Sequence, residues 1–198
     1  MWRATEMTAV DERGVAEFFA GFEPPEGLKV ELLRGEIVMM ASPDLVHNRI
    51  VTSLMDQIPH RRWERLQTQD VDVVDEASEP VPDLVVMEVG VGPDSGRLLP
   101  SQMITMVVEV VSKTSVDRDY GVKRLIYAAG EVPAYLIVDP VMAQCVLYSE
   151  PVGRGEGADY QVQRITQFGT PLPLELLDVE LDTTEFGTYK GVKPHHRP

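Results

Sequence analysis

The sequence predicts an α/β fold of the α+β kind, in which helices flank one central mixed β-sheet. Two observations support this prediction: strand-like runs of branched apolar residues alternate with helical stripes, and no internal repeat interrupts the chain. A length of 198 residues, of which 43% are hydrophobic, suits a single globular domain. We therefore expect one sizeable core around the sheet.

The first third of the chain predicts a helix, a hairpin and a second helix. Apolar residues near helical spacing favour a helix over residues 8–22. Strand-like runs over residues 29–33 and 36–40 flank Gly35, whose tolerance of positive φ favours a hairpin. Capping residues then precede an apolar stripe at i, i+4 and i+8, which predicts a helix that ends at Pro59.

The rest of the chain alternates strands with one further helix. Alternation or runs of branched residues predict strands over residues 66–74, 83–89, 103–111, 134–138, 144–148 and 160–165. A helix is predicted over residues 117–129, with Gly130 as its stop. Residues 90–101 combine Gly, Pro, Asp and Ser, which predicts a surface loop.

Charge and cysteine content exclude several classes of function. A balance of 32 Asp and Glu against 18 Lys and Arg gives a formal net charge of −14, opposite to the basic footprint of most nucleic-acid binders. Avid non-specific binding to DNA or to anionic membranes is therefore disfavoured, although a local basic groove is compatible with an acidic chain. Cys145 is the only cysteine, and we see neither an export signal nor a membrane span, so we expect a cytoplasmic protein.

Two carboxylates on successive predicted strands are the candidates for chemistry. Asp83 opens one strand after Pro82, and Glu109 lies in the middle of the next apolar strand. A buried ionised carboxylate is costly unless a cation or hydrogen-bond donors compensate it. On neighbouring strand ends, the two would offer hard oxygen ligands of the kind that hold Mg²⁺. We therefore predict a site for Mg²⁺ or Mn²⁺ at Asp83 and Glu109.

A lysine near such a pair could orient the attacking water or neutralise phosphate charge. Position 111 lies on the same strand face as Glu109, but Val111 cannot fill this role. Lys113 keeps the same parity and lies at the exit of the strand, whereas Lys123 lies on the following helix and could reach back to the sheet. We favour Lys123.

Each candidate also has a structural interpretation. Asp83 can cap a strand, and Glu109 can belong to a buried ion pair. Lys123 can pair with Asp119 at i, i+4 on a solvated helix face. The arginines around Trp63 can contact phosphates while the ring stacks on a base, or they can form a solvated helix end.

An ordered set of motifs extends this interpretation beyond single residues. In chain order the motifs are Glu31-Leu32-Leu33-Arg34-Gly35-Glu36, Ser42-Pro43 with His47, Pro82-Asp83, Val108-Glu109-Val110, Asp119 with Lys123 and Tyr127, and Ala134-Tyr135-Leu136-Ile137-Val138-Asp139-Pro140. With these motifs the chain resembles the Uma2 family of the PD-(D/E)XK nuclease superfamily, over residues 27–165. Because each short piece alone is weak, the specificity lies in the order.

The resemblance implies a restriction-endonuclease-like core with metal ligands at Asp83 and Glu109. It implies that the superfamily lysine is displaced to Lys123 on the helix, and it places Glu31 and His47 near the site. From the residues alone, a hairpin glutamate more often faces solvent, and a histidine beside an apolar helix stripe is more often a polar flank than a ligand.

The chain departs from the family pattern in two places. Ser112-Lys113-Thr114-Ser115 stands where the family has Ser-Pro-Ser-Thr, which keeps Lys113 as the second candidate for the working lysine. Leu136 stands where a Trp is common. We divide the chain into an N-terminal helical segment over residues 1–26, the Uma2-like domain over residues 27–185 and a disordered tail over residues 186–198.

The leading functional prediction is a metal-dependent endonuclease that hydrolyses phosphodiester bonds in DNA. Its predicted catalytic residues are Asp83, Glu109, Lys123, Glu31 and His47. The alternative is a catalytically inactive protein of the same fold that acts as a dimeric regulatory or binding scaffold. DNA is the expected partner, bound weakly at physiological salt, and a homodimer is expected because two-fold pairing is the commonest closed assembly. No membrane partner is expected.

Overall fold

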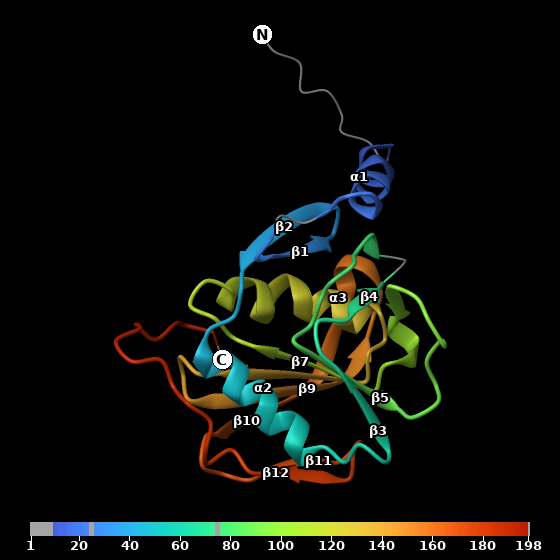
Figure 1. Cartoon of the computed structure of the whole chain (residues 1–198). Coiled ribbons are helices and arrows are strands. Elements are labelled where there is room, and N and C mark those ends of the chain that lie inside the picture. The colour runs from blue at the N-terminus through green and yellow to red at the C-terminus, as the bar shows by residue number, and fades with distance from the viewer. Residues whose placement is uncertain (1–9, 24–25, 74–75, 198) are drawn as a thin grey trace.

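The computed structural model describes residues 10–23, 26–73 and 76–197, and its centre is a six-stranded sheet with helices on both sides (Figure 1). Along the sheet the strand order is β10-β9-β8-β7-β5-β3. These strands are Trp63–Leu66 (β3), Leu84–Glu88 (β5), Met106–Val110 (β7), Ala134–Asp139 (β8), Gln144–Val152 (β9) and Asp159–Gln167 (β10). β7 and β8 run parallel, and the other neighbouring pairs are antiparallel. The predicted mixed sheet is confirmed.

Three two-stranded sheets, four longer helical segments and two 3₁₀ turns complete the described architecture. The small sheets pair Leu28–Leu33 (β1) with Glu36–Ala41 (β2), Asp70–Asp72 (β4) with Leu98–Pro100 (β6), and Leu172–Leu174 (β11) with Val179–Leu181 (β12). The longer helical segments are Val10–Ala20 (α1), Leu45–Gln57 (α2), the π-helical turn Arg118–Lys123 (η3) and Arg124–Ala129 (α3). Single 3₁₀ turns span Ser101–Met103 (η2) and Gly155–Gly157 (η4).

The predicted single strand over residues 66–74 is wrong. Its residues belong to two strands, because β3 ends before Thr68 and β4 begins after it, and Thr68 has a φ of 49° in the left-handed region. β3 pairs with β5, whereas β4 pairs with β6, which lies inside the predicted loop over residues 90–101. The alternation of apolar and polar residues continues through this turn, so periodicity alone does not reveal the break.

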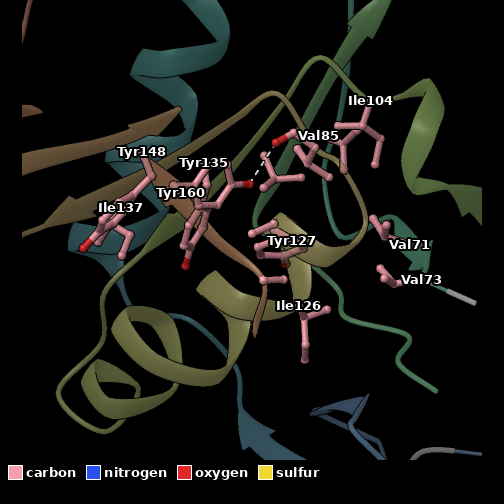
Figure 2. Packing of buried hydrophobic residues seen from close by; sticks show 14 of the residues in the cluster. Val71, Val73, Val85, Ile104, Ile126, Tyr127, Tyr135, Ile137, Tyr148 and Tyr160 are labelled. Carbon is pink, nitrogen blue, oxygen red and sulfur yellow. Dashed lines mark hydrogen bonds between the residues drawn. The ribbon is translucent and has the colours of Figure 1, made fainter. Parts of the chain in front are cut away.

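The sheet separates two apolar layers, and this division decides where Glu109 points. Along β7 and the residue after it, Val107 and Val111 pack in the layer that contains α3, while Val108 and Val110 pack in the layer that contains α2. Because side chains alternate along a strand, Glu109 faces the α3 layer. Figure 2 shows part of this layer, with residues of α3 beside tyrosines of the sheet.

The β1–β2 hairpin lies over one end of the central domain and places one of its faces toward the sheet (Figure 1). Backbone hydrogen bonds between Leu32 and Glu79 join it to the domain. Val30 and Leu32 pack against Phe19 of α1. By strand alternation, Lys29 and Glu31 occupy the opposite face, which is turned toward the sheet.

The segment predicted to be a disordered tail contacts the domain in residues 186–197. The Tyr189 amide donates to the Pro140 carbonyl, and the Arg197 guanidinium pairs with Asp117 at 3.0 Å. These partners are distant in sequence and belong to no periodic pattern, so the sequence does not reveal them. In the described part of the chain we find no apolar helix of the length that a bilayer span requires.

Asp44 caps α2 and offers a test of this part of the fold. Its Oδ1 accepts hydrogen bonds from the amides of Val46 at 3.0 Å and His47 at 3.1 Å. We expect Asp44→Ala to lower the free energy of unfolding by about 1 kcal/mol, measured by urea denaturation, because two helix amides lose their acceptor. Asp44→Asn keeps a capping oxygen and should lose less, and an equal loss in both variants would contradict this assignment.

Candidate active site

The register of β5 against β7 brings the two candidate carboxylates to neighbouring strands. The strands are antiparallel, with Leu84 opposite Val108, so continuing the register by one residue sets Asp83 opposite Glu109. The Asp83 amide donates to the Val108 carbonyl at 3.1 Å. Its Oδ2 accepts from the Val110 amide at 2.9 Å, which holds the carboxylate against β7.

Lys123 contacts Glu109 in the interior of the protein and does not face solvent. Its Nζ donates to Glu109 Oε1 at 2.8 Å and to Glu31 Oε1 at 2.9 Å, and its side chain is only 2% exposed. The Tyr127 hydroxyl donates to the same oxygen of Glu109 at 2.8 Å. Asp119 Oδ1 is 4.0 Å from Nζ. The alternative of an Asp119–Lys123 pair on a solvated helix face is therefore wrong.

The β1–β2 hairpin and the first turn of α2 complete the site around Asp83. Lys29 Nζ lies 3.2 Å from Asp83 Oδ1, and His47 Nε2 lies 2.8 Å from Asp83 Oδ2. Glu31 is fully buried, so it does not face solvent. Its Oε1 accepts from the Val81 amide at 2.9 Å, and its Oε2 is buried without a hydrogen-bond donor among the described residues.

Burial decides the ionisation of Glu109 and Asp119. Removal from water raises the pKa of Glu109 to about 8, against the opposing charge of Lys123. Burial likewise raises the pKa of Asp119 to about 6, although Lys123 and a hydrogen bond from Ser115 oppose the shift. Lys123 is shared among Glu31, Glu109 and Asp119, so its single positive charge does not offset the cost of burying three negative charges.

Asp83, His47 and Lys123 shift in the direction that favours their charged forms. Burial opposes ionisation of Asp83, but Lys29 and the His47 hydrogen bond outweigh it and hold the pKa of Asp83 well below its ordinary range. Burial would lower the pKa of His47, yet its bond to Asp83 raises it. For Lys123, burial is outweighed by Glu109 and Glu31, so its pKa is raised.

These side chains line one cavity of about 220 Å³. The charged side chains described above form one cluster around Asp83 and Glu109. Its members on the cavity wall are Lys29, His47, Asp83, Glu109, Asp119 and Lys123. Larger hollows of about 520 and 720 Å³ lie elsewhere, and neither contains Asp83 or Glu109. The geometry therefore brings four of the five sequence-predicted site residues to one cavity wall, with Glu31 behind them on Lys123.

Sequence reasoning missed Lys29, Asp119 and Tyr127 as members of the cluster. Lys29 lies two residues before Glu31 on one strand, so the two side chains are expected to share a face. Tyr127 lies four residues after Lys123, so these two are expected to share a helix face. What the sequence cannot supply is the packing of the hairpin onto the sheet, which turns that face inward.

Two other sequence candidates form no described hydrogen bond or ion pair with these carboxylates. Lys113 is exposed, with its Nζ 5.1 Å from the centre of the Tyr189 ring, and forms no ion pair with a described carboxylate. Trp63 is 4% exposed, and its Nε1 donates to the Leu177 carbonyl at 3.1 Å. A stacking role for Trp63 on a nucleic-acid base is therefore wrong.

The donor set fits a magnesium-type ion. No group of three or more His, Cys, Asp or Glu suited to a metal occurs among the residues that the structure describes. Mg²⁺, however, usually binds through one or two carboxylates and keeps several waters. Glu109 accepts both of its described hydrogen bonds on Oε1, which leaves Oε2 for a ligand. If all four carboxyl groups of the cluster are ionised and His47 is neutral, their charge exceeds that of the two lysines by two, which one divalent cation would balance.

A mixed sheet with carboxylates on adjacent strands and a buried lysine from the following helix defines a restriction-endonuclease-like protein. Residues 16–184 match the model of the Uma2 family, described as "Putative restriction endonuclease". The chain belongs to the Uma2 family.

A solved structure supports the fold. A chain from Anabaena variabilis ATCC 29413, described as "a putative nuclease belonging to DUF820", aligns with a TM-score of 0.61 and 15% sequence identity. The alignment covers 82% of this chain and 90% of that one. No curated protein matches.

Proposed function

We propose that this protein is a Mg²⁺- or Mn²⁺-dependent endonuclease that hydrolyses phosphodiester bonds in DNA. The observation that carries the proposal is the meeting of Asp83 and Glu109 in one cavity, with Lys123 bound to Glu109. The descriptions of the family and of the structural neighbour, both of which name nucleases, support it. The buried position of Lys123 on Glu109 also favours it over an inactive scaffold, in which this lysine would be free to face solvent.

The proposed roles follow from the contacts. Asp83 and Glu109 would hold the divalent ion, which when bound activates water and stabilises charge on the phosphoryl oxygens. Lys123 and Tyr127 fix the orientation of Glu109 by binding one of its oxygens. Lys29 and His47 keep Asp83 ionised, and Glu31 holds Lys123 from the other side. In the hydrolysis, a water oxygen bonds to phosphorus while the bond to the leaving oxygen breaks, and that oxygen takes up a proton.

Cleavage of plasmid and single-stranded DNA at low salt tests the proposal. We expect the wild type to cleave with Mg²⁺ or Mn²⁺, and Asp83→Asn to reduce the rate at least about 100-fold because a ligand oxygen becomes an amide. Asp178→Asn is the matched control, since that side chain is 91% exposed and lies outside the cavity. Asp83→Asn with wild-type activity would exclude the proposed site.

The same assay separates the alternative function. If neither the wild type nor the variants cleave any DNA, the dimeric scaffold replaces the nuclease as the leading interpretation. Low salt matters because a chain with a net charge of −14 is expected to bind DNA weakly at physiological salt. The homodimer, the cytoplasmic location and the division at residues 26 and 185 stay predictions.

A further inference from the structure

The cavity contains two cations that the carboxylate cluster does not use. Lys29, His47 and Lys123 each contact a carboxylate. Lys113 and Arg118 also line the cavity, yet neither forms an ion pair with a carboxylate among the described residues. In a chain of net charge −14, two cations that lie beside a group of carboxylates without pairing with them form a local site for an anionic ligand.

Arg118 carries the stronger signal. It is the first residue of η3, two residues into the helical segment that follows the loop after β7, and it is partly buried. Its Nε is buried and has no hydrogen-bond acceptor in the described protein. A buried guanidinium nitrogen without an acceptor costs free energy, and a phosphate oxygen is an acceptor whose geometry matches the guanidinium fork.

The surroundings of Arg118 keep its guanidinium available. The neighbouring Asp117 is bound by Arg197 from the C-terminal segment at 3.0 Å. The carboxylate of Asp119 accepts from Ser115 at 2.5 Å and lies near Lys123. Both carboxylates adjacent in sequence are therefore engaged elsewhere.

Lys113 is held at the same cavity by an aromatic ring. Its Nζ lies over the Tyr189 ring, and the Tyr189 hydroxyl lies 3.2 Å from Asp44 Oδ1 at the start of α2. The C-terminal segment thus holds this ammonium at the cavity without neutralising it, because a cation–π contact leaves the positive charge in place.

We propose that Arg118 and Lys113 form a phosphate clamp that binds a backbone phosphate next to the scissile one. This inference rests on the proposed function and adds a substrate-binding site to it. The clamp supplies positive charge beside the carboxylates that is not already paired with them, unlike Lys29, His47 and Lys123. It recognises the phosphodiester backbone and not the base sequence, since both groups are cations suited to phosphate oxygens. Arg118 and Lys113 are thus substrate-binding residues.

Binding of a fluorescent DNA duplex tests the clamp, measured by anisotropy in EDTA over a range of salt concentrations. We expect Arg118→Gln and Lys113→Gln each to weaken binding roughly tenfold at low salt. Each should also lower the slope of log K against log salt by about 0.9, the effect of losing one phosphate contact. Arg118→Lys keeps the charge and should retain the wild-type slope.

Arg154→Gln is the matched control, because it removes one charge from a side chain that is 87% exposed and does not line the cavity. Thermal melting of each variant verifies that the fold is intact. In the cleavage assay, Arg118→Gln should raise KM more than it lowers kcat. Binding and cleavage by Arg118→Gln and Lys113→Gln that match the Arg154→Gln control would overturn the clamp and leave the nuclease proposal standing.

DNA binding without cleavage would also distinguish the two proposals. A wild type that binds DNA with a slope dependent on Arg118 and Lys113, yet cleaves nothing with Mg²⁺ or Mn²⁺, would overturn the nuclease and leave the clamp. A wild type that neither binds nor cleaves would overturn both.

Discussion

Replacing Lys123 with Met is expected to lower the free energy of unfolding by about 3–5 kcal/mol, because it leaves buried carboxylates without their cation. Met has similar length, so the loss reports the charge and not a large cavity. The ammonium lies 2.9 Å from Glu31 and 2.8 Å from Glu109, in a side chain that is 2% exposed. Chemical denaturation at neutral pH measures the effect.

The pH dependence of this variant provides a second readout. Without the ammonium, the pKa values of Glu109 and Asp119 should rise further above about 8 and about 6, because Lys123 lowers both. The destabilisation should therefore be smaller at pH 5, where both groups can hold a proton, than at pH 8. Lys190→Met is the control, since Lys190 is exposed, and its change should stay within about 0.5 kcal/mol. A Lys123→Met protein as stable as the wild type would show that the buried pair does not hold the site together.

Glu109→Gln is expected to separate activity from stability. Cleavage should fall at least about 100-fold, because the amide cannot replace the carboxylate as a metal ligand. Stability at pH 8 should be equal to that of the wild type or greater, because the neutral amide avoids the cost of a buried charge. Lys123 still keeps Glu31 as its partner.

The sign of the pH effect follows from the shifted pKa. The folded state holds the Glu109 proton up to about pH 8, whereas the unfolded chain releases it near the ordinary value of 4.5. Between these values the folded state binds more protons, so the contribution of Glu109 to stability is present at low pH and declines as the pH rises. Unfolding measured from pH 5 to pH 8 should therefore show a shallower decline for Glu109→Gln.

Asp83→Asn should affect stability differently from Glu109→Gln, because the pKa of Asp83 is lowered whereas that of Glu109 is raised. Lys29 and His47 lower the pKa of Asp83, so its charge stabilises the fold above the ordinary aspartate pKa, and that stabilisation is lost as the pH falls. At neutral pH we expect Asp83→Asn to be less stable than Glu109→Gln, although both lose cleavage. The reverse order of stability would contradict the electrostatics described for this site.

The meeting of Asp83 and Glu109, the proposed metal ligands, could be predicted from the sequence because its signals are local. A glutamate inside an apolar strand and an aspartate at the start of the preceding one need no distant information, and strand alternation gives the face that Glu109 occupies. The favoured lysine was likewise chosen by position, since Lys113 lies at the strand exit and Lys123 on the helix above the same face. The structure places Lys123, and not Lys113, on Glu109.

The partners of Asp83 could not be predicted in the same way. Lys29 belongs to a hairpin and His47 to a helix whose stripe packs on the other layer of the sheet. The contacts of Lys29 and His47 with Asp83 depend on how the hairpin and α2 pack over the start of β5. Likewise, Trp63 lies among arginines that suggest an exposed surface, yet its ring is buried by the segment around Leu177.

Local sequence patterns were sufficient to predict the mixed sheet, the order of the long elements, and the strand face and strand end where the two carboxylates lie. These properties follow from periodicities of two and 3.6 residues and from capping chemistry, which act within a few positions. Three features became visible only in the folded chain: the hairpin turns Lys29 and Glu31 inward, the predicted strand over residues 66–74 is divided in two, and the Arg118 Nε has no acceptor among the described residues beside the cavity. Periodicity tells which face a residue occupies, whereas the element that covers this face is set by long-range packing.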